Sequence, residues 1–219
     1  MRADKPTYKS IRMKKTILTL LLLLLIGPLS AEITYGVRAG GAYSSLLQRR
    51  DDLLKSGGRF GYSIAGLADI RLYHRLSLRP ELVFTNQGGS YYTRYGFPDA
   101  VQHKCNYFSV QVPVNVMYTF TYEGVKFGAG GGPCIDVPLW GHTKTDGHRR
   151  LMDFGTRPGD DLKAFDLGVN VGINIEYSRF FFAINAFCGV LNRSPLKKEG
   201  EPSVYQNNVT FSLGYMFRR

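Results

Sequence analysis

The strongest constraint in this sequence is the alternation of apolar and polar residues through 165–192, FDLGVNVGINIEYSRFFFAINAFCGVLN. From 165 to 177 the odd positions are large apolar or aromatic residues, and the even positions are Gly, Asn, Asp or Glu. A period of two is typical of a β-strand with one apolar and one polar face. Ser178-Arg179 marks a turn, and a second amphipathic strand starts at Phe180. Strands of this length suit a membrane crossing, which takes about 9–11 tilted residues. A soluble barrel or sandwich with its apolar face inside has the same pattern.

The N-terminal region predicts export. Residues 13–31, MKKTILTLLLLLLIGPLSA, have two lysines, a Leu-rich run and a small-residue end, which is the layout of a secretory signal peptide. We predict a signal peptide at 1–31, cleaved after Ala31, with Met13 as an alternative start of translation. A single signal anchor is the other interpretation, but the apolar run is shorter than the roughly 20 residues that a spanning helix needs. The mature chain would be a single domain at 32–219.

Charge and cysteine content exclude several classes of protein. The formal net charge is +11, but residues 1–31 hold six Lys or Arg and one Asp, so the mature chain has +6. These charges are scattered, and no basic run interleaved with aromatics indicates nucleic-acid binding. Cys105, Cys134 and Cys188 fit neither a disulfide framework nor a zinc pattern. We expect buried free thiols, with one bridged pair as the alternative.

The alternation recurs along the whole mature chain. Besides the two strands of the 165–192 hairpin, it predicts strands at 33–43, 60–72, 76–87, 106–120, 125–137 and 204–217. Tight turns are expected at 73–75, 121–124 and 178–179, and long polar links at 44–59, 88–105, 138–162 and 192–203. Short turns at one end and long loops at the other are typical of outer-membrane barrels. The sequence therefore predicts an all-β fold, an eight-stranded antiparallel transmembrane up-and-down β-barrel with periplasmic turns.

Two further features bear on this prediction. Aromatic residues near the turns would form a periplasmic belt: Tyr35, Tyr73, Phe120, Tyr177, Phe180, Tyr215 and Phe217. Pro80 and Pro113 fall inside predicted strands, where a missing N–H interrupts the hydrogen-bonded ladder. We expect local β-bulges there.

Four segments resemble the PorT-like family of porin-type outer-membrane β-barrels: GYSIAGLADIRLYHRLSLRPELVFTNQGG at 61–89, YFSVQVPVNVMYTF at 107–120, FDLGVNVGINIEY at 165–177 and VTFSLGYMF at 209–217. The resemblance covers nearly the whole mature chain, and the RPEL core and both prolines recur in that family. It implies a barrel in the outer membrane of a Gram-negative bacterium. It implies little about activity, although the founding member belongs to a secretion machinery.

The predicted register turns nine charged residues into the barrel: Arg38, Asp69, Arg71, Arg79, Glu81, Lys126, Asp136, Asp166 and Glu176. Side chains fill the interior of an eight-stranded barrel, so charges there have to pair. We interpret the nine as a salt-bridged plug. A solute or proton path, or a carboxylate pair in acid–base catalysis, is the alternative.

Other candidate sites are weaker. The run 128–132, GAGGG, lacks the Lys-Ser/Thr of a phosphate loop. His142 and His148 bracket Asp146 without a third defined ligand for a metal. No motif pairs a serine with a histidine for hydrolysis, so we expect no catalytic, cofactor or metal site. An aromatic group in the second long link is a candidate surface for a partner protein or glycan, with packing onto the barrel as the alternative: Tyr91, Tyr92, Tyr95 and Phe97.

Taken together, these patterns predict a non-enzymatic outer-membrane barrel with a filled lumen. Its expected role is a structural or accessory component of an envelope assembly, with a secretion assembly implied by the resemblance. Its expected partners are outer-membrane lipid, lipopolysaccharide and envelope proteins, and not nucleic acid. A small-solute channel is the first alternative, and a soluble lipocalin-like periplasmic binder is the second.

Overall fold

The computed structural model describes residues 32–50, 53–93, 98–157, 159–195 and 202–217. The predicted signal peptide, 1–31, lies outside the described residues. The strands are β1 (Ile33–Arg50), β2 (Leu53–Tyr73), β3 (Leu76–Thr93), β4 (Val101–Tyr122), β5 (Val125–Thr145), β6 (His148–Leu151), β7 (Asp166–Tyr177), β8 (Phe180–Gly189) and β9 (Ser203–Phe217). Within these ranges no helix is both long enough and apolar enough to cross a membrane.

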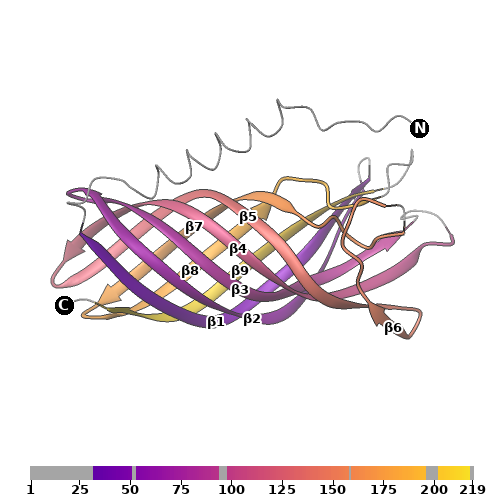
Figure 1. The fold of residues 1–219 in the computed structure, drawn as a ribbon, viewed down its shortest axis with the longest axis horizontal. Coiled ribbons are helices and arrows are strands. Elements are labelled where there is room, and N and C mark those ends of the chain that lie inside the picture. The colour runs from indigo at the N-terminus through magenta and orange to yellow at the C-terminus, as the bar shows by residue number, and fades with distance from the viewer. Residues whose placement is uncertain (1–31, 51–52, 94–97, 158, 196–201, 218–219) are drawn as a thin grey trace, which may run out of the picture. The chain divides into compact units, whose positions relative to one another are not determined.

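Eight of these strands close into a barrel (Figure 1). Neighbours follow the order β4-β3-β2-β1-β9-β8-β7-β5, and β4 also pairs with β5, which closes the ring. Every pairing in the ring is antiparallel. The short β6 extends only β5, as a hairpin at the loop end. The predicted eight-stranded antiparallel barrel is therefore confirmed.

The register of the barrel sets the tilt of its strands. Following paired residues once around the ring from Ile33 leads back to β1 at Tyr43, ten residues further along the strand. The path runs through Ile70, Leu78, Val116, Gly131, Val171, Ala186 and Val209. An offset of this size in an eight-stranded barrel corresponds to strands tilted by roughly 40°. Each residue then advances about 2.5 Å along the barrel axis, given a rise of about 3.3 Å along the strand.

Tight turns join the strands at one end of the barrel. Glu123 and Gly124, between β4 and β5, both have positive φ angles, 48° and 80°. Two central residues with positive φ form a type I′ turn, whose twist matches that of the flanking strands. Figure 1 shows β1 beginning and β9 ending at this same end. An even number of strands requires that arrangement.

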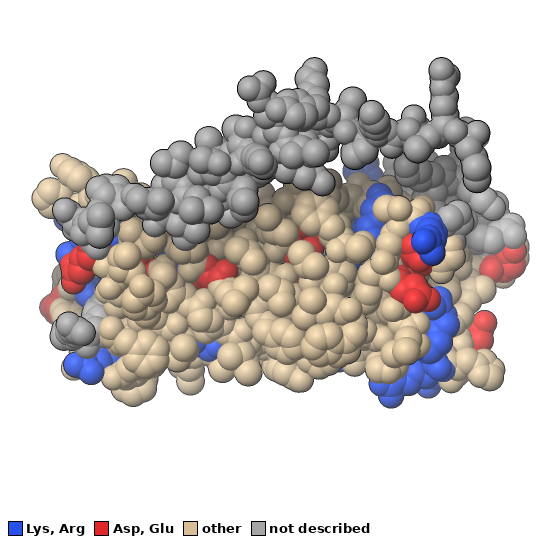
Figure 2. Space-filling model, in the orientation of Figure 1, with Lys and Arg blue, Asp and Glu red and all other residues tan. Residues whose placement is uncertain are grey.

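The two faces alternate as the sequence predicts. In β7, buried and exposed residues alternate from Asp166 to Tyr177, with the carboxylates and asparagines inside. Most large apolar side chains of the other strands point outward, so the exterior of the barrel is largely apolar. On the face that Figure 2 shows, few charged side chains lie over the middle of the barrel. An apolar exterior around a polar interior is the arrangement of a barrel in a bilayer. A soluble barrel turns its apolar face inward.

Aromatic residues ring the barrel at two heights. The predicted turn-end belt includes Phe180, Tyr215 and Phe217, with successive ring centroids 5.2 and 5.4 Å apart. A loop-end belt consists of Tyr43, Phe60, Tyr62, Phe84, Phe108 and Trp140. Tyr35 and Tyr43, which lie in the two belts, are eight residues apart on β1, which places the belts roughly 20 Å apart along the axis. This separation fits an apolar band of about 25 Å flanked by aromatic girdles.

The predicted long links are wrong in extent. Residues 44–59 lie almost wholly in β1 and β2, and 88–93 and 101–105 extend β3 and β4. Above the loop-end belt the outer face of a strand has left the apolar band, while the inner face lines an apolar cluster. The contrast between an apolar outer face and a polar inner face therefore disappears, although the backbone groups still pair. The strands therefore continue about seven residues, or roughly 17 Å along the axis, beyond that belt.

The bulges expected at Pro80 and Pro113 are also wrong. Pro80 pairs with Val114, and Val83 pairs with Gln111, in one unshifted register. The pairing skips the positions between them, so the ladder tolerates the missing N–H groups without an inserted residue. The register shift of β4 and β5 lies elsewhere, where Ser109 faces Pro138 and Phe108 faces Trp140.

Candidate functional site: the lumen and its mouth

Three ion pairs occupy the lower lumen. Nε and Nη2 of Arg38 each lie 2.9 Å from Oε2 of Glu81, and Nη1 of Arg38 donates to Ser212 at 3.2 Å. Arg79 pairs with Asp69, its Nε donating to Oδ2 at 3.0 Å. Nζ of Lys126 lies 3.6 Å from Oε1 of Glu176. The structure thus brings together six of the nine predicted lumen charges.

The other three predicted charges lie at the two ends of the lumen. Arg71 is exposed near the end of β2, at the turn end. Asp136 and Asp166, paired across β5 and β7, are fully buried toward the loop end. With one exposed arginine and two buried carboxylates left over, the predicted set requires a further cation to balance its interior.

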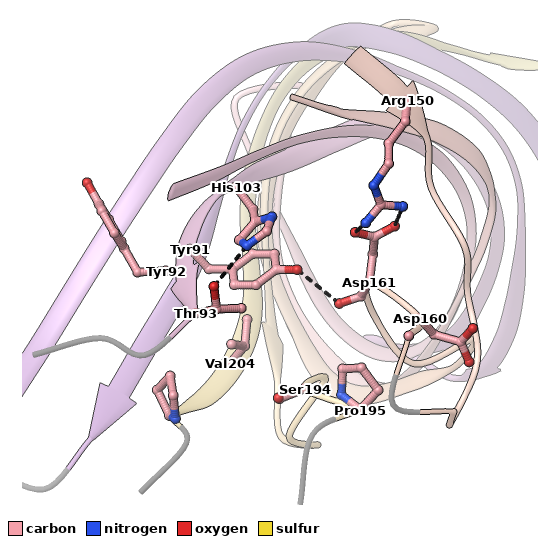
Figure 3. A pocket seen from close by; sticks show the side chains of 12 residues that line it. Tyr91, Tyr92, Thr93, His103, Arg150, Asp160, Asp161, Ser194, Pro195 and Val204 are labelled. Carbon is pink, nitrogen blue, oxygen red and sulfur yellow. Dashed lines mark hydrogen bonds and ion pairs between the residues drawn. The ribbon is translucent and has the colours of Figure 1, made fainter. Parts of the chain in front are cut away.

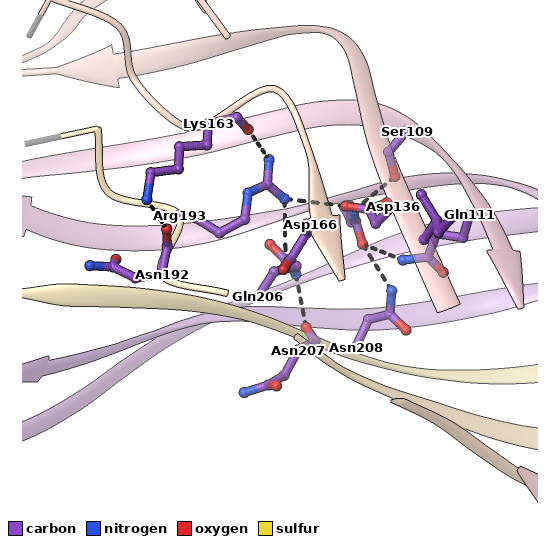
Figure 4. Close-up of polar contacts among 12 residues, drawn as sticks. Ser109, Gln111, Asp136, Lys163, Asp166, Asn192, Arg193, Gln206, Asn207 and Asn208 are labelled. Atoms are coloured by element: carbon purple, nitrogen blue, oxygen red, sulfur yellow. Dashed lines mark hydrogen bonds and ion pairs between the residues drawn. The ribbon is translucent and has the colours of Figure 1, made fainter. Parts of the chain in front are cut away.

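Arg193 supplies that cation (Figure 4). Its side chain is 0% exposed, and its Nη1 lies 3.2 Å from Oδ2 of Asp136 and 4.0 Å from Oδ2 of Asp166. Nη2 donates to the carbonyl oxygen of Lys163 at 2.8 Å. Because Arg193 follows β8 in an irregular segment, no alternation marks it as inward-facing. The excess of carboxylates over cations in the predicted lumen was the signal that a loop had to provide one.

Uncharged polar side chains complete this upper network. Nε2 of Gln87 donates to both oxygens of Asp136 at 3.1 and 3.0 Å, and Asn208 donates to Oε1 of Gln87 at 2.8 Å. Tyr107 donates to Oε1 of Gln206 at 2.7 Å and accepts from Arg193 at 3.4 Å. By contrast, neither side-chain oxygen of Asp166 has a hydrogen bond. Among the described residues, Arg193 is therefore the cation that compensates the charge of Asp166.

One apolar cluster lies among the lower ion pairs, and a second lies above the Arg193 network. Leu67, Phe181, Ala183 and Met216 pack together toward the turn end. Above the Arg193 network a second cluster packs with Phe154 against it: Leu46, Tyr91, Cys105, Tyr107, Met152, Leu162 and Val204. The void among the lower ion pairs measures only about 10 Å³, which is room for about one water. The described lumen is thus filled by paired charges, with apolar side chains packed among the lower pairs and above the upper network.

The segments 152–157 and 159–163 form the upper closure. They leave the β5–β6 hairpin and turn back over the mouth, where Gly155 N donates to Leu162 O at 3.0 Å. Arg150 binds Asp161 through two parallel hydrogen bonds of 2.9 and 2.7 Å. A bidentate arginine–carboxylate pair is geometrically specific. It holds this closure in place.

A cavity of about 150 Å³ opens beside that pair (Figure 3). His103 lies in its wall, with Nε2 3.0 Å from Thr93 Oγ1 and Nδ1 2.9 Å from Thr145 Oγ1. The ring stacks on Tyr91 at a centroid distance of 5.0 Å. His103 lies five residues beyond Phe108 of the loop-end belt, and burial lowers its pKa from the ordinary 6.5.

The structure describes two of the four residues of the predicted aromatic surface. Tyr91 is buried and donates to Asp161 O at 3.2 Å, so it packs onto the barrel and offers no free surface. It turns inward because β3 continues through this region. Tyr92 faces out and lies under Lys55, whose Nζ is 4.0 Å from the ring centroid. Tyr95 and Phe97 lie outside the described residues.

The remaining candidates show no built site. Within the described residues no three His, Cys, Asp or Glu side chains are grouped to hold a metal. The cysteines are free, with Cys105 and Cys134 buried and Cys188 exposed. In the 128–132 run, a Cβ at Gly130 or Gly132 would collide with the β4 backbone. Close strand approach, and not phosphate binding, accounts for those glycines.

Comparison with protein families agrees with the architecture. Residues 28–190 match the family model described as outer membrane protein beta-barrel domain. Among solved structures, Neisserial surface protein A aligns at a TM-score of 0.48 and 14% identity, over 85% of this chain and 99% of that one. Ail of Yersinia pestis aligns at 0.45 and 12%, over 85% and 99%. OprG from Pseudomonas aeruginosa aligns at 0.38 and 10%, over 86% and 98%. No curated protein sequence matches.

Proposed function

Because the chain belongs to the outer membrane protein β-barrel domain family, we propose that it is a closed barrel that serves as a structural or accessory component of an envelope assembly. The observation that carries this proposal is the filling of the lumen by paired charges and apolar clusters. Arg38, Lys126 and Arg193 each face a carboxylate. One apolar cluster packs among the lower pairs, and another lies above Arg193. A barrel whose interior is occupied in this way acts through its surfaces.

The loop-end rim is the surface available for partners. The strands rise roughly 17 Å beyond the loop-end belt, and the rim is stiffened by the Arg150–Asp161 pair. We assign the chain to the PorT-like branch on the strength of segments 61–89, 107–120, 165–177 and 209–217, which makes a secretion assembly the preferred context. We also propose that residues 1–31 are a cleaved signal peptide and that the protein is not an enzyme. Cleavage predicts Glu32 as the first residue of protein recovered from outer membranes.

The small-solute channel remains the second candidate, because the lumen is lined with charge. Conductance of the reconstituted protein separates the two. The closed barrel predicts no steady single-channel steps in a planar bilayer. Regular steps from the wild-type protein would favour the channel.

Partner capture tests the accessory role itself. Cross-linking in intact cells, followed by detergent extraction and pull-down of a tagged chain, should recover a reproducible set of envelope proteins. Recovery of the barrel alone would contradict an accessory role. Recovery from the soluble periplasm would support the lipocalin-like binder, against which the outward apolar face argues.

A further inference from the structure

A row of three cations crosses the outer face of the loop end. Lys104 of β4 pairs directly with Lys144 of β5, and Lys144 pairs directly with Arg149 of β6. All three side chains are exposed, and they point away from the lumen, because the neighbouring Cys105 and Thr143 are buried inside. Figure 2 shows Lys and Arg side chains gathered over this part of the barrel, while the surface between the belts is mostly tan.

This row is unfavourable for the isolated protein. Directly opposed residues on antiparallel strands have Cβ atoms about 5 Å apart, and like charges in such positions destabilise a sheet. The turn at Asp146-Gly147, with φ angles of 49° and 86°, is a two-residue hairpin that locks Lys144 opposite Arg149. No hydrogen bond or ion pair joins Lys104, Lys144 or Arg149 to any described residue. A local rule broken without compensation from the described residues points to a ligand outside the chain.

The height of the row identifies the ligand's chemistry. Two residues below Lys104 and Lys144 lie Asn106 and His142, and two further below lie Phe108 and Trp140 of the loop-end belt. From the membrane outward, the surface therefore changes from aromatic to neutral polar to cationic. At about 2.5 Å per residue, the cations lie roughly 10 Å above the belt. This is where the headgroups of the outer leaflet begin.

We propose that Lys104, Lys144 and Arg149 form a binding site for the phosphorylated headgroup of an outer-leaflet glycolipid, with its acyl chains against Phe108 and Trp140. Ser90, which pairs with Lys104 on the other side, adds a hydroxyl to the row. Asp146, in the turn of the β5–β6 hairpin, contributes one negative charge, so the site as a whole stays net positive. This proposal rests on the outer-membrane location but not on the closed lumen. Conductance by the wild-type protein would therefore contradict the closed barrel without contradicting the lipid site.

The test compares two triple variants in zwitterionic detergent. One carries Lys104→Gln, Lys144→Gln and Arg149→Gln. The control carries Arg49→Gln, Arg75→Gln and Arg179→Gln, which removes the same charge elsewhere on the exterior. Binding is measured with diphosphoryl lipid A and with its dephosphorylated form, after the heat-dependent gel shift has shown that each variant is folded.

Each basic side chain near an anionic lipid surface contributes about fivefold to binding, so we expect the site variant to bind the phosphorylated lipid roughly 100-fold more weakly. The control and the dephosphorylated lipid set the background. Equal losses in both variants would overturn the proposal, since they would reflect general charge alone. Competition by inorganic phosphate at the lipid's own concentration would also overturn it, because the recognised group would then be a free anion.

A second measurement does not depend on lipid binding. Without lipid, at low salt, removal of the opposed cations should raise the thermal unfolding midpoint of the site variant above that of the control. Added lipid A should raise the midpoint of the wild type but not that of the site variant. A site variant less stable than the control without lipid would show that the row is not repulsive, which removes the reason for a ligand.

Discussion

Replacement of Arg193 by methionine tests the closed lumen most directly. Methionine keeps much of the side-chain length and removes the guanidinium that lies 3.2 Å from Asp136 and 4.0 Å from Asp166. Loss of one partner from a buried ion pair costs about 3–5 kcal/mol, because the remaining charge is buried without compensation. Gln87 still donates to Asp136, which favours the lower figure, but Asp166 keeps no hydrogen bond, which favours the higher. We therefore expect a loss of about 4 kcal/mol.

The assay is equilibrium urea unfolding in lipid vesicles. Trp140 is the single tryptophan, and it lies in the loop-end belt, so its emission reports withdrawal from the interface. The matched control is Arg75→Met, since Arg75 is exposed at the turn end and donates to Tyr118 at 3.1 Å. Surface changes of this kind usually stay within about 0.5 kcal/mol.

A rescue distinguishes charge from packing. Adding Asp136→Asn and Asp166→Asn to the Arg193 variant removes both uncompensated charges, so most of the lost stability should return. A loss below about 1 kcal/mol for Arg193→Met would refute the reasoning, because it would mean that water solvates these carboxylates and the lumen is open. A full loss without rescue would assign the effect to packing.

Three further predictions concern other parts of the barrel. Gly132→Ala should destabilise by about 1–3 kcal/mol in urea unfolding, because its Cβ would meet the β4 backbone, whereas Gly41→Ala has open space and should cost nothing or add a few tenths. Since burial lowers the pKa of His103, the unfolded chain binds more protons below about pH 6.5, so stability should fall as the pH drops below that value. His103→Gln should flatten this dependence in unfolding at several pH values, and His74→Gln, at an exposed turn, should not. Emission of Trp140 should be quenched more strongly by lipids brominated near the headgroup than by lipids brominated at the chain ends. The reverse order would contradict the position of the loop-end belt at the membrane interface.

The sequence was informative where each face of a strand meets a single kind of environment. Between the two belts lipid lies outside and packed polar side chains lie inside, so alternation predicted the strands, their faces and the inward charges such as Glu81. Beyond Phe108 and Trp140 that contrast ends, and the strand extensions were not predicted. Which lumen charges pair with one another was not predictable either. A period of two gives the direction in which a side chain points but not its height along the barrel axis. Arg193 was missed because it lies in an irregular segment after β8, where no alternation marks a side chain as inward-facing.

The cations inside the barrel and those on its outer face have different explanations. In the lumen Arg38, Lys126 and Arg193 each lie within 4.0 Å of a carboxylate, although burying such pairs gives little stability over an apolar interior. What the pairs provide is a filled, polar interior whose partners fix one register among strands that would otherwise slip. On the outer face Lys104 and Lys144 stand side by side without a carboxylate between them. The chain pairs its charges inside the barrel, where water is scarce. On the exposed outer face carboxylates could be placed beside the cations without a desolvation cost, so folding gives no reason for the aligned cations. The aligned row is therefore explained by what the surface binds, and the lumen by what holds the barrel closed.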